Sequence, residues 1–199
     1  MSDAKTLMEL AGGPPPPARL EDAAVVIIDA QNEYVDGALV LPDVGPALDQ
    51  IALLLSAARS AHAPVIHIAH KGGDGGPFDR NDHRGQLADQ AAALPEETVI
   101  EKPLPNAFAH TSLHEALEAT GRKSLIIAGF MTHMCVSSTA RAALDLGYQT
   151  TVLADASATR ALPDQTGGPD IDAQSLHRAA LAGLGDRFAV IAKTAAVAK

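Results

Sequence analysis

Three residues with chemically versatile side chains, Asp29, Lys102 and Cys135, each come after the carboxyl end of a predicted strand. A carboxylate, an ammonium and a thiol can together perform nucleophilic catalysis. The carboxylate takes the thiol proton, and the ammonium stabilises the thiolate or orients the acid. Cys135 is expected at the first turn of a helix, where backbone N–H groups and the helix dipole favour an anion. We therefore expect a lowered thiol pKa and a reactive sulfur.

Each of the three residues also has an ordinary structural explanation. A single cysteine is often an inert core residue, an aspartate after a strand is often a turn cap, and a lysine in a loop is usually solvated. Their joint placement at three strand ends favours a functional interpretation.

The elements that must position these residues alternate along the chain. Apolar runs predict strands at 23–28, 65–69, 98–101, 124–129, 149–154 and 188–192. Helical spacing and capping residues predict helices at 43–61, 112–120, 135–146 and 172–184, with Asp43 and Ser112 as N-caps. This alternation predicts an α/β fold with three layers, α/β/α, around a doubly wound, mainly parallel six-stranded sheet. The carboxyl ends of parallel strands share one edge, where ligands bind, so Asp29, Lys102 and Cys135 should meet there.

Composition narrows the class of protein. The chain has 199 residues, 47% of them apolar, with one cysteine and a formal net charge of −9. We expect a single domain over 21–199, preceded by a Pro/Gly-rich arm at 1–20 that is either solvated or packed on a neighbouring subunit. The acidic balance argues against nucleic acid and anionic membranes as partners. The lone cysteine and the absence of a membrane span or a signal-peptide pattern in this sequence favour a cytoplasmic location.

Several motifs, taken in order, resemble the isochorismatase-like cysteine hydrolase superfamily, which includes nicotinamidases and N-carbamoylsarcosine amidases. The matching segments are VVIIDAQNEY, EKPLPNAF, AGFMTHMCVSSTARAALDLGY, VLADASATR and LHRAALAGLGDRFAVI. The resemblance implies an Asp29–Lys102–Cys135 triad and a cis peptide between Phe130 and Met131. It also implies oxyanion donation by the backbone N–H groups of Met131 and Cys135, and a homo-oligomer, dimer or tetramer.

The resemblance leads us to expect a cysteine-dependent amidohydrolase. It would cleave a small amide, carbamoyl or ureido C–N bond through a thioester, with a small-molecule substrate and no cofactor. Three alternatives stay open: vinyl ether hydrolysis of the isochorismatase type, a non-catalytic binding member of the same fold, and a flavodoxin-like redox or nucleotide domain.

Further residues are expected around the pocket. The substrate-pocket candidates are Gln31, Tyr34, His70, Phe108, Phe130 and Thr132. The Thr132 hydroxyl is expected to hold the turn before Cys135, and His177 is interpreted as a structural histidine. The Asp-x-His metal-ligand pair of nicotinamidases is missing after the second strand, so no metal is predicted. An ion held in the 71–86 loop by His70, Asp74, Asp79 and His83 is the alternative.

Overall fold

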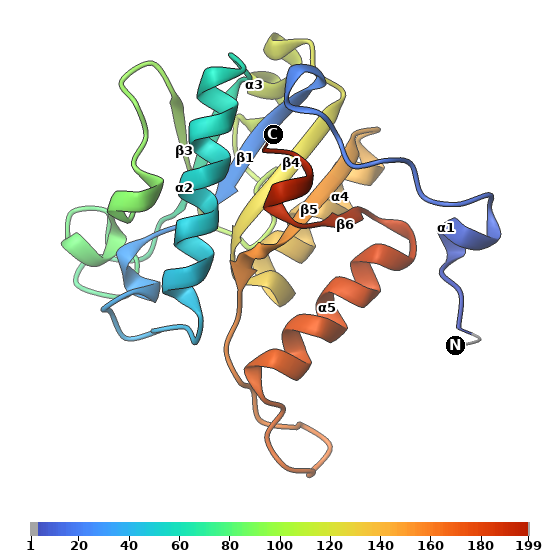
Figure 1. Cartoon of the computed structure of the whole chain (residues 1–199). Helices are drawn as coiled ribbons and strands as arrows, with labels where there is room; N and C mark the ends of the chain where they lie inside the picture. The colour runs from blue at the N-terminus through green and yellow to red at the C-terminus, as the bar shows by residue number, and fades with distance from the viewer. Residues whose placement is uncertain (1–3, 199) are drawn as a thin grey trace.

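Six parallel strands form one sheet in the order β3-β2-β1-β4-β5-β6, as seen in the computed structural model of residues 4–198 (Figure 1). The strands are β1 Ala23–Ile28, β2 Val65–His70, β3 Thr98–Lys102, β4 Ser124–Phe130, β5 Gln149–Ala158 and β6 Val190–Ala192. The strand order reverses at β1, which confirms the prediction of a doubly wound parallel sheet.

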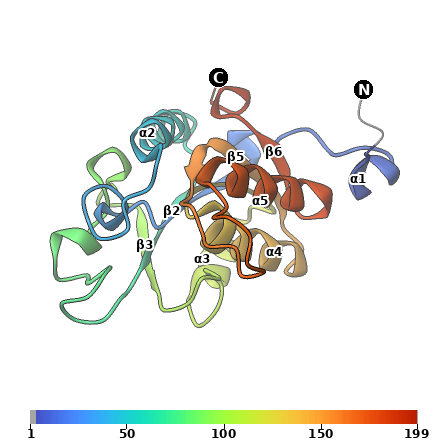
Figure 2. The same cartoon turned by 90° about the horizontal axis from the view of Figure 1, so that it is seen from below.

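Helices cover both faces of this sheet. They are α2 Val44–Ser60, α3 Leu113–Thr120, α4 Ser137–Asp145 and α5 Ala173–Arg187, whereas the short α1 Leu7–Leu10 lies beside α5 and away from the sheet. Alternate residues of β1 and β4 point to opposite faces. Val25 and Ile27 pack with α2 on one side, whereas Val26 and Ile28 pack in the cluster formed with α3, α4 and α5. Seen from below, α2 lies on one side of the sheet and α3, α4 and α5 lie on the other (Figure 2). The result is the expected three-layer arrangement.

Two predicted boundaries at the carboxyl edge of the sheet were wrong. Strand β5 continues to Ala158 instead of ending at 154. A register shift between Ile127 and Gly129 lets β4 resume pairing with β5, at Gly129 with Ser157 and at Phe130 with Ala158. Helix α4 begins at Ser137 instead of Cys135, because the chain first makes a π-helical turn over Thr132–Val136.

Two predicted helix caps were also wrong. The side chains of Asp43 and Ser112 make no capping hydrogen bond. Asp43 has a left-handed backbone conformation, and the hydroxyl of Thr111 accepts the N–H of Leu113 at 3.2 Å. Asp172 does cap α5, since its carboxylate accepts the N–H of Ser175 at 2.9 Å.

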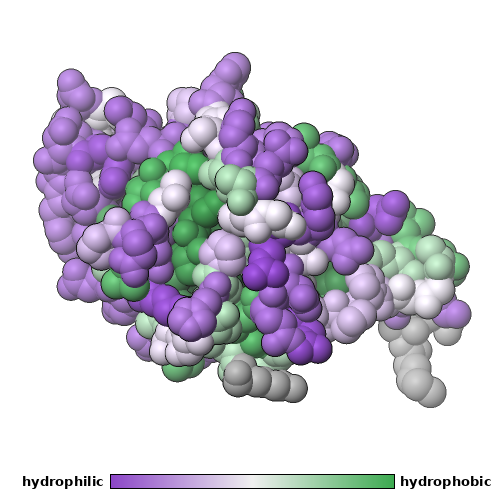
Figure 3. All heavy atoms as spheres, turned by 90° about the horizontal axis from the view of Figure 1, so that it is seen from above, coloured by the Kyte–Doolittle hydropathy of each residue, from purple (hydrophilic) through white to green (hydrophobic). Residues whose placement is uncertain are grey.

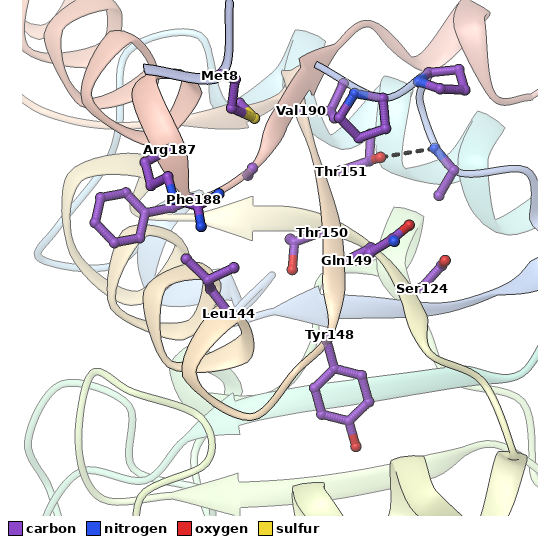
Figure 4. Close-up of a pocket in the computed structure, with 14 residues that line it drawn as sticks. Met8, Ser124, Leu144, Tyr148, Gln149, Thr150, Thr151, Arg187, Phe188 and Val190 are labelled. Atoms are coloured by element: carbon purple, nitrogen blue, oxygen red, sulfur yellow. Dashed lines mark hydrogen bonds between the residues drawn. The ribbon is translucent and has the colours of Figure 1, made fainter. Parts of the chain in front are cut away.

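The described part of the N-terminal arm is fastened to its own chain. The Leu7 N–H donates to Asp186 Oδ1 at 2.7 Å, and the Ala18 N–H donates to Thr151 Oγ1 at 2.9 Å. Between these anchors, Met8, Pro15 and Pro16 border a cleft of about 230 Å³ at the amino end of the sheet. Figure 4 shows this cleft with Leu144, Phe188 and Val190 around it and the Ala18–Thr151 hydrogen bond beside it. Most described residues of the arm are nonetheless exposed, as expected for a solvated tail, and these two backbone hydrogen bonds fix its path along the chain.

The upper face, where the strands begin, is mostly hydrophilic, with hydrophobic residues visible in a hollow (Figure 3). None of the helices in residues 4–198 combines the length and apolar character needed to cross a bilayer.

Candidate active site

The Lys102 ammonium contacts the three other polar residues of the site. Its Nζ lies 2.7 Å from Asp29 Oδ2, 3.3 Å from Cys135 Sγ and 3.4 Å from His70 Nδ1. These four residues come from four consecutive positions across the sheet: Lys102 from β3, His70 from β2, Asp29 after β1 and Cys135 after β4. The parallel strand order therefore brings Asp29, Lys102 and Cys135 together at the carboxyl edge, where the sequence placed them.

Burial makes these contacts strong. Asp29 and Lys102 are completely excluded from solvent, and Cys135 is 5% exposed. The Asp29 carboxylate lies against the Lys102 ammonium, and the Cys135 thiol and the His70 backbone also act on it as hydrogen-bond partners. A carboxylate has about four acceptor sites, more than these partners use. The carboxylate thus keeps lone pairs that can accept a proton.

The backbone at the two strand ends is specialised. Asp29 has a φ of 49°, a left-handed conformation that aspartate tolerates better than most residues. Gly129 has a φ of 120°, and a Cβ there would lie 2.0 Å from the carbonyl oxygen of Ile28. Glycine therefore lets the end of β4 approach the end of β1 closely, which brings the cysteine turn next to Asp29.

The turn that carries Cys135 follows β4 directly. The peptide between Phe130 and Met131 is cis, and the Val136 N–H donates to the carbonyl of Met131 at 3.2 Å. The buried Thr132 hydroxyl contacts the carbonyl oxygen of Ala158 at 3.0 Å and His177 Nδ1 at 2.9 Å. These bonds tie the turn to β5 and α5.

The electrostatics of the thiol differ from the expectation. Burial, and secondarily the negative charge of Asp29, raise the pKa of Cys135 to about 12, and the charge of Lys102 offsets only part of this. The expected lowering was wrong because Cys135 lies in a buried turn before α4, where desolvation of the thiolate dominates. Burial also raises the pKa of Asp29 against the opposing effect of Lys102. The resting site therefore holds a thiol next to a carboxylate that readily accepts a proton.

His70 is neutral in this setting. Burial, followed by the nearby Lys102 charge, lowers the pKa of His70 to about 4. Its unprotonated Nδ1 can accept a hydrogen bond from the Lys102 ammonium. His70 therefore helps to orient the ammonium toward Asp29 and Cys135.

Gln31 has a structural role that the sequence did not reveal. Its Nε2 donates to the carbonyl oxygens of His70 and Gly85 at 3.0 and 2.8 Å, and its Oε1 accepts the His70 N–H at 2.8 Å. The amide is thus used to hold His70 and the following loop, and its place as a substrate contact is not supported by this geometry.

Aromatic rings pack next to the four polar residues. Tyr34 makes edge contacts with Phe78 at 5.1 Å and Phe130 at 5.7 Å between ring centroids, and Phe78 makes one with His70 at 5.2 Å. Sequence reasoning missed Phe78, although it is the only aromatic residue in the Gly-rich 71–86 segment. The described ring contact of Phe108 is with Tyr148, at 6.0 Å, so its position in the substrate pocket stays a prediction.

Arg160 contributes positive charge near this cluster. Its charge acts on Tyr34 and lowers the pKa of His133, after the larger effect of burial on that histidine. Arg160 Nε is buried without a hydrogen-bond partner, and no carboxylate of residues 4–198 lies within ion-pair distance of its guanidinium. By contrast, Lys71 and Arg80 pair with Glu101, and Arg84 pairs with Asp82.

The 71–86 loop uses its candidate metal ligands in other ways. Asp79 accepts the N–H groups of Gly75 and Asn81, and His83 pairs with Asp36. Within residues 4–198, no group of three or more His, Cys, Asp or Glu side chains is arranged to hold a metal ion.

The fold and this cluster define one class of protein, a doubly wound α/β/α domain with a cysteine, an aspartate and a lysine at the carboxyl edge of its sheet. The isochorismatase domain model matches residues 23–196. A crystal structure of an isochorismatase from Pseudomonas putida KT2440 superposes with a TM-score of 0.93 and 44% identity, covering 98% of this chain and 99% of that one.

Curated relatives agree with this match. A secreted isochorismatase effector of Verticillium dahliae is 35% identical over 92% of this chain and 93% of its own length. A ureidoacrylate amidohydrolase of Methylobacterium radiotolerans is 29% identical over 92% of this chain and 81% of its own length. The chain belongs to the isochorismatase family and is a hydrolase.

Proposed function

We propose that this hydrolase is a cysteine-dependent amidohydrolase that cleaves a small amide, carbamoyl or ureido C–N bond through a thioester. The observation that carries the proposal is the position of Lys102 Nζ, 2.7 Å from Asp29 Oδ2 and 3.3 Å from Cys135 Sγ. A buried acid, ammonium and thiol in mutual contact suit covalent catalysis at a carbonyl carbon. The name of the ureidoacrylate amidohydrolase relative supports amide chemistry in the family.

The proposed acylation begins from a protonated thiol. Asp29 takes the thiol proton while Cys135 Sγ attacks the carbonyl carbon, so a free thiolate does not accumulate. The oxyanion accepts hydrogen bonds from the backbone N–H groups of Met131 and Cys135. Asp29 then gives its proton to the leaving nitrogen, the C–N bond breaks, and a thioester remains on Cys135.

Deacylation reverses the proton path. Water gives a proton to Asp29, and its oxygen attacks the thioester carbon. The C–S bond breaks, and Cys135 Sγ recovers the proton from Asp29, which releases the acid. The Lys102 ammonium stabilises both the Asp29 carboxylate and the sulfur as negative charge develops there.

A panel of primary amides, carbamoyl compounds and ureido acids tests the proposal by ammonia release. We expect Cys135→Ala and Cys135→Ser to abolish release, and Asp29→Asn to reduce it by at least 10³-fold, of the order found when the groups of a catalytic unit are removed. Intact-protein mass spectrometry during turnover should reveal an acyl adduct on Cys135. Amide hydrolysis that survives Cys135→Ala would exclude the covalent route.

Vinyl ether hydrolysis is a second candidate, because two of the similar proteins are named isochorismatases. That reaction needs no covalent nucleophile. Isochorismate cleavage retained in Cys135→Ala, together with no ammonia from any amide, would favour it over the amidohydrolase.

We further propose that residues 21–199 form one hydrolase domain that assembles as a dimer or tetramer in the cytoplasm. Light scattering on the purified chain tests the assembly, and fractionation of the native cells tests the location. One relative is named as a secreted effector, so recovery of this protein from the culture medium would contradict the proposed cytoplasmic location.

A further inference from the structure

His177 lies outside the cluster of Asp29, Lys102 and Cys135 but contacts the turn that carries the cysteine. It projects from α5 and is half-buried, and its Nδ1 lies 2.9 Å from Thr132 Oγ1. Thr132 is the first residue of the π-helical turn, follows Met131 directly and is completely buried. The His177 ring also interacts with the backbone of Ala154 on β5.

The hydrogen-bond pattern assigns a direction to this contact. The Thr132 hydroxyl has one proton, and the Ala158 carbonyl, 3.0 Å away, can only accept it. Both contacts of the hydroxyl are satisfied when Thr132 donates to Ala158 and accepts from a protonated His177 Nδ1. Burial lowers the pKa of His177, whereas the Ala154 backbone and the charge of Asp43 act in the opposite direction. The assignment of Nδ1 as the donor rests on the two contacts of the Thr132 hydroxyl.

The Thr132 side chain therefore has its orientation set from two sides, by β5 and by α5. Its backbone lies between Met131 and Cys135, the two residues whose N–H groups are proposed to bind the oxyanion. The two contacts of the Thr132 hydroxyl anchor the backbone of the turn to β5 and α5. Loss of one anchor would let the backbone of the turn shift, and small misplacements of oxyanion donors reduce catalytic rates strongly.

We propose that His177 is a positioning residue that holds the oxyanion-binding turn through Thr132. This inference rests on the proposed function for its kinetic consequences. The hydrogen bond itself can be tested separately.

Three single variants and one double variant separate positioning from simple loss of structure. We expect His177→Ala to lower kcat by about 10–100-fold with KM changed less than about threefold. His177→Asn should restore most of the kcat, because its amide N–H can reach the position of Nδ1. Thr132→Val should lose a similar factor, and the Thr132→Val/His177→Ala double variant should lose little more, since both changes remove one interaction.

A readout independent of substrate is the amide NMR spectrum of 15N-labelled protein. The Met131 and Cys135 amide signals should shift in His177→Ala and return toward their original positions in His177→Asn. His114→Ala is the matched control, because His114 Nδ1 also contacts a hydroxyl, that of Tyr148 at 3.1 Å, but on α3. It should leave kcat and both amide signals unchanged.

The outcomes are distinguishable. If no amide is hydrolysed by the wild-type chain, the proposed function fails, and the two amide signals still decide whether His177 sets the turn. Unchanged signals in a folded His177→Ala, or additive losses in the double variant, would overturn the positioning role. If His177→Ala does not fold, the kcat of His177→Asn is compared with that of Thr132→Val. A kcat of His177→Asn no higher than that of Thr132→Val would overturn the positioning role.

Discussion

Lys102 Nζ lies 2.7 Å from Asp29 Oδ2, in a place where both side chains are fully excluded from solvent. Such a pair is costly to disrupt, because removal of one partner leaves an uncompensated buried charge. The pair therefore links the stability of the fold to the chemistry of the site.

Lys102→Met should destabilise the protein by about 3–5 kcal/mol, because Asp29 then loses its buried counter-charge. Urea denaturation measures this loss. The Asp29→Asn/Lys102→Met double variant should recover most of the stability while remaining inactive, because asparagine is uncharged and tolerates the left-handed φ of 49° at this position. Lys71→Met, which removes an exposed partner of Glu101, is the control and should change stability little. A double variant no more stable than Lys102→Met alone would contradict the interpretation.

Asp29→Asn should have opposite effects on turnover and on thiol reactivity. The negative charge of Asp29 is one cause of the raised pKa of Cys135, so its removal should lower that pKa and leave Lys102 to stabilise the thiolate. We expect faster iodoacetamide alkylation of Cys135 at pH 7–8 together with loss of hydrolysis.

In the wild type, the thiol pKa of about 12 predicts that the alkylation rate rises with pH through pH 10 without a plateau. Slow alkylation near neutral pH is therefore compatible with covalent catalysis. A plateau near pH 7, read by mass spectrometry, would show that the resting site holds a thiolate.

Arg160 should select substrates that carry a negative charge. Its guanidinium acts on Tyr34 and His133 beside the site and has no carboxylate partner in the described chain. Arg160→Gln should raise KM for ureido acids or amides bearing a carboxylate by about tenfold or more, the loss expected for one charge-assisted hydrogen bond. KM for neutral amides is the internal control, and an equal rise for both classes would contradict a selective role.

Gly129→Ala should be strongly destabilising. The added Cβ would lie 2.0 Å from the Ile28 carbonyl oxygen at a φ of 120°, so β4 would have to move away from β1. We expect a loss above about 3 kcal/mol in urea denaturation. Gly45→Ala is the matched control in α2, where a Cβ would meet nothing within 4 Å. It should be neutral or stabilising by up to about 1 kcal/mol.

Glu97 should make stability sensitive to acid. Burial alone would raise the pKa of Glu97, but hydrogen bonds from Arg59, Leu94 and His67 outweigh it and lower the pKa from 4.5 to about 2. Because the folded-state pKa is depressed, this stabilisation is present above pH 4.5 and is lost as pH falls toward 2. Urea midpoints should therefore fall between pH 5 and pH 3, and fall less in Glu97→Gln. Parallel decreases in both proteins would assign the acid sensitivity to other groups.

Much of the fold could be predicted because its signals are local. The apolar runs that form β1 and β4 are recognisable in any context, since strands covered on both faces need continuous apolar residues. Asp29, Lys102 and Cys135 could be placed together by the rule that parallel strands end at one edge. Non-local signals were missed: the continuation of β5 to Ala158 depends on its pairing with β4.

The sequence by itself determined which reactive residues follow which strands: an aspartate after the first, a lysine after the third and a cysteine after the fourth. Tertiary structure alone decided the protonation state of the resting thiol, because desolvation depends on every element that covers Cys135. It also decided that the Gln31 amide binds backbone and that Phe78 packs beside His70, since these contacts join segments far apart in the chain. Local patterns select residue types, whereas burial and pairing decide what those residues can do.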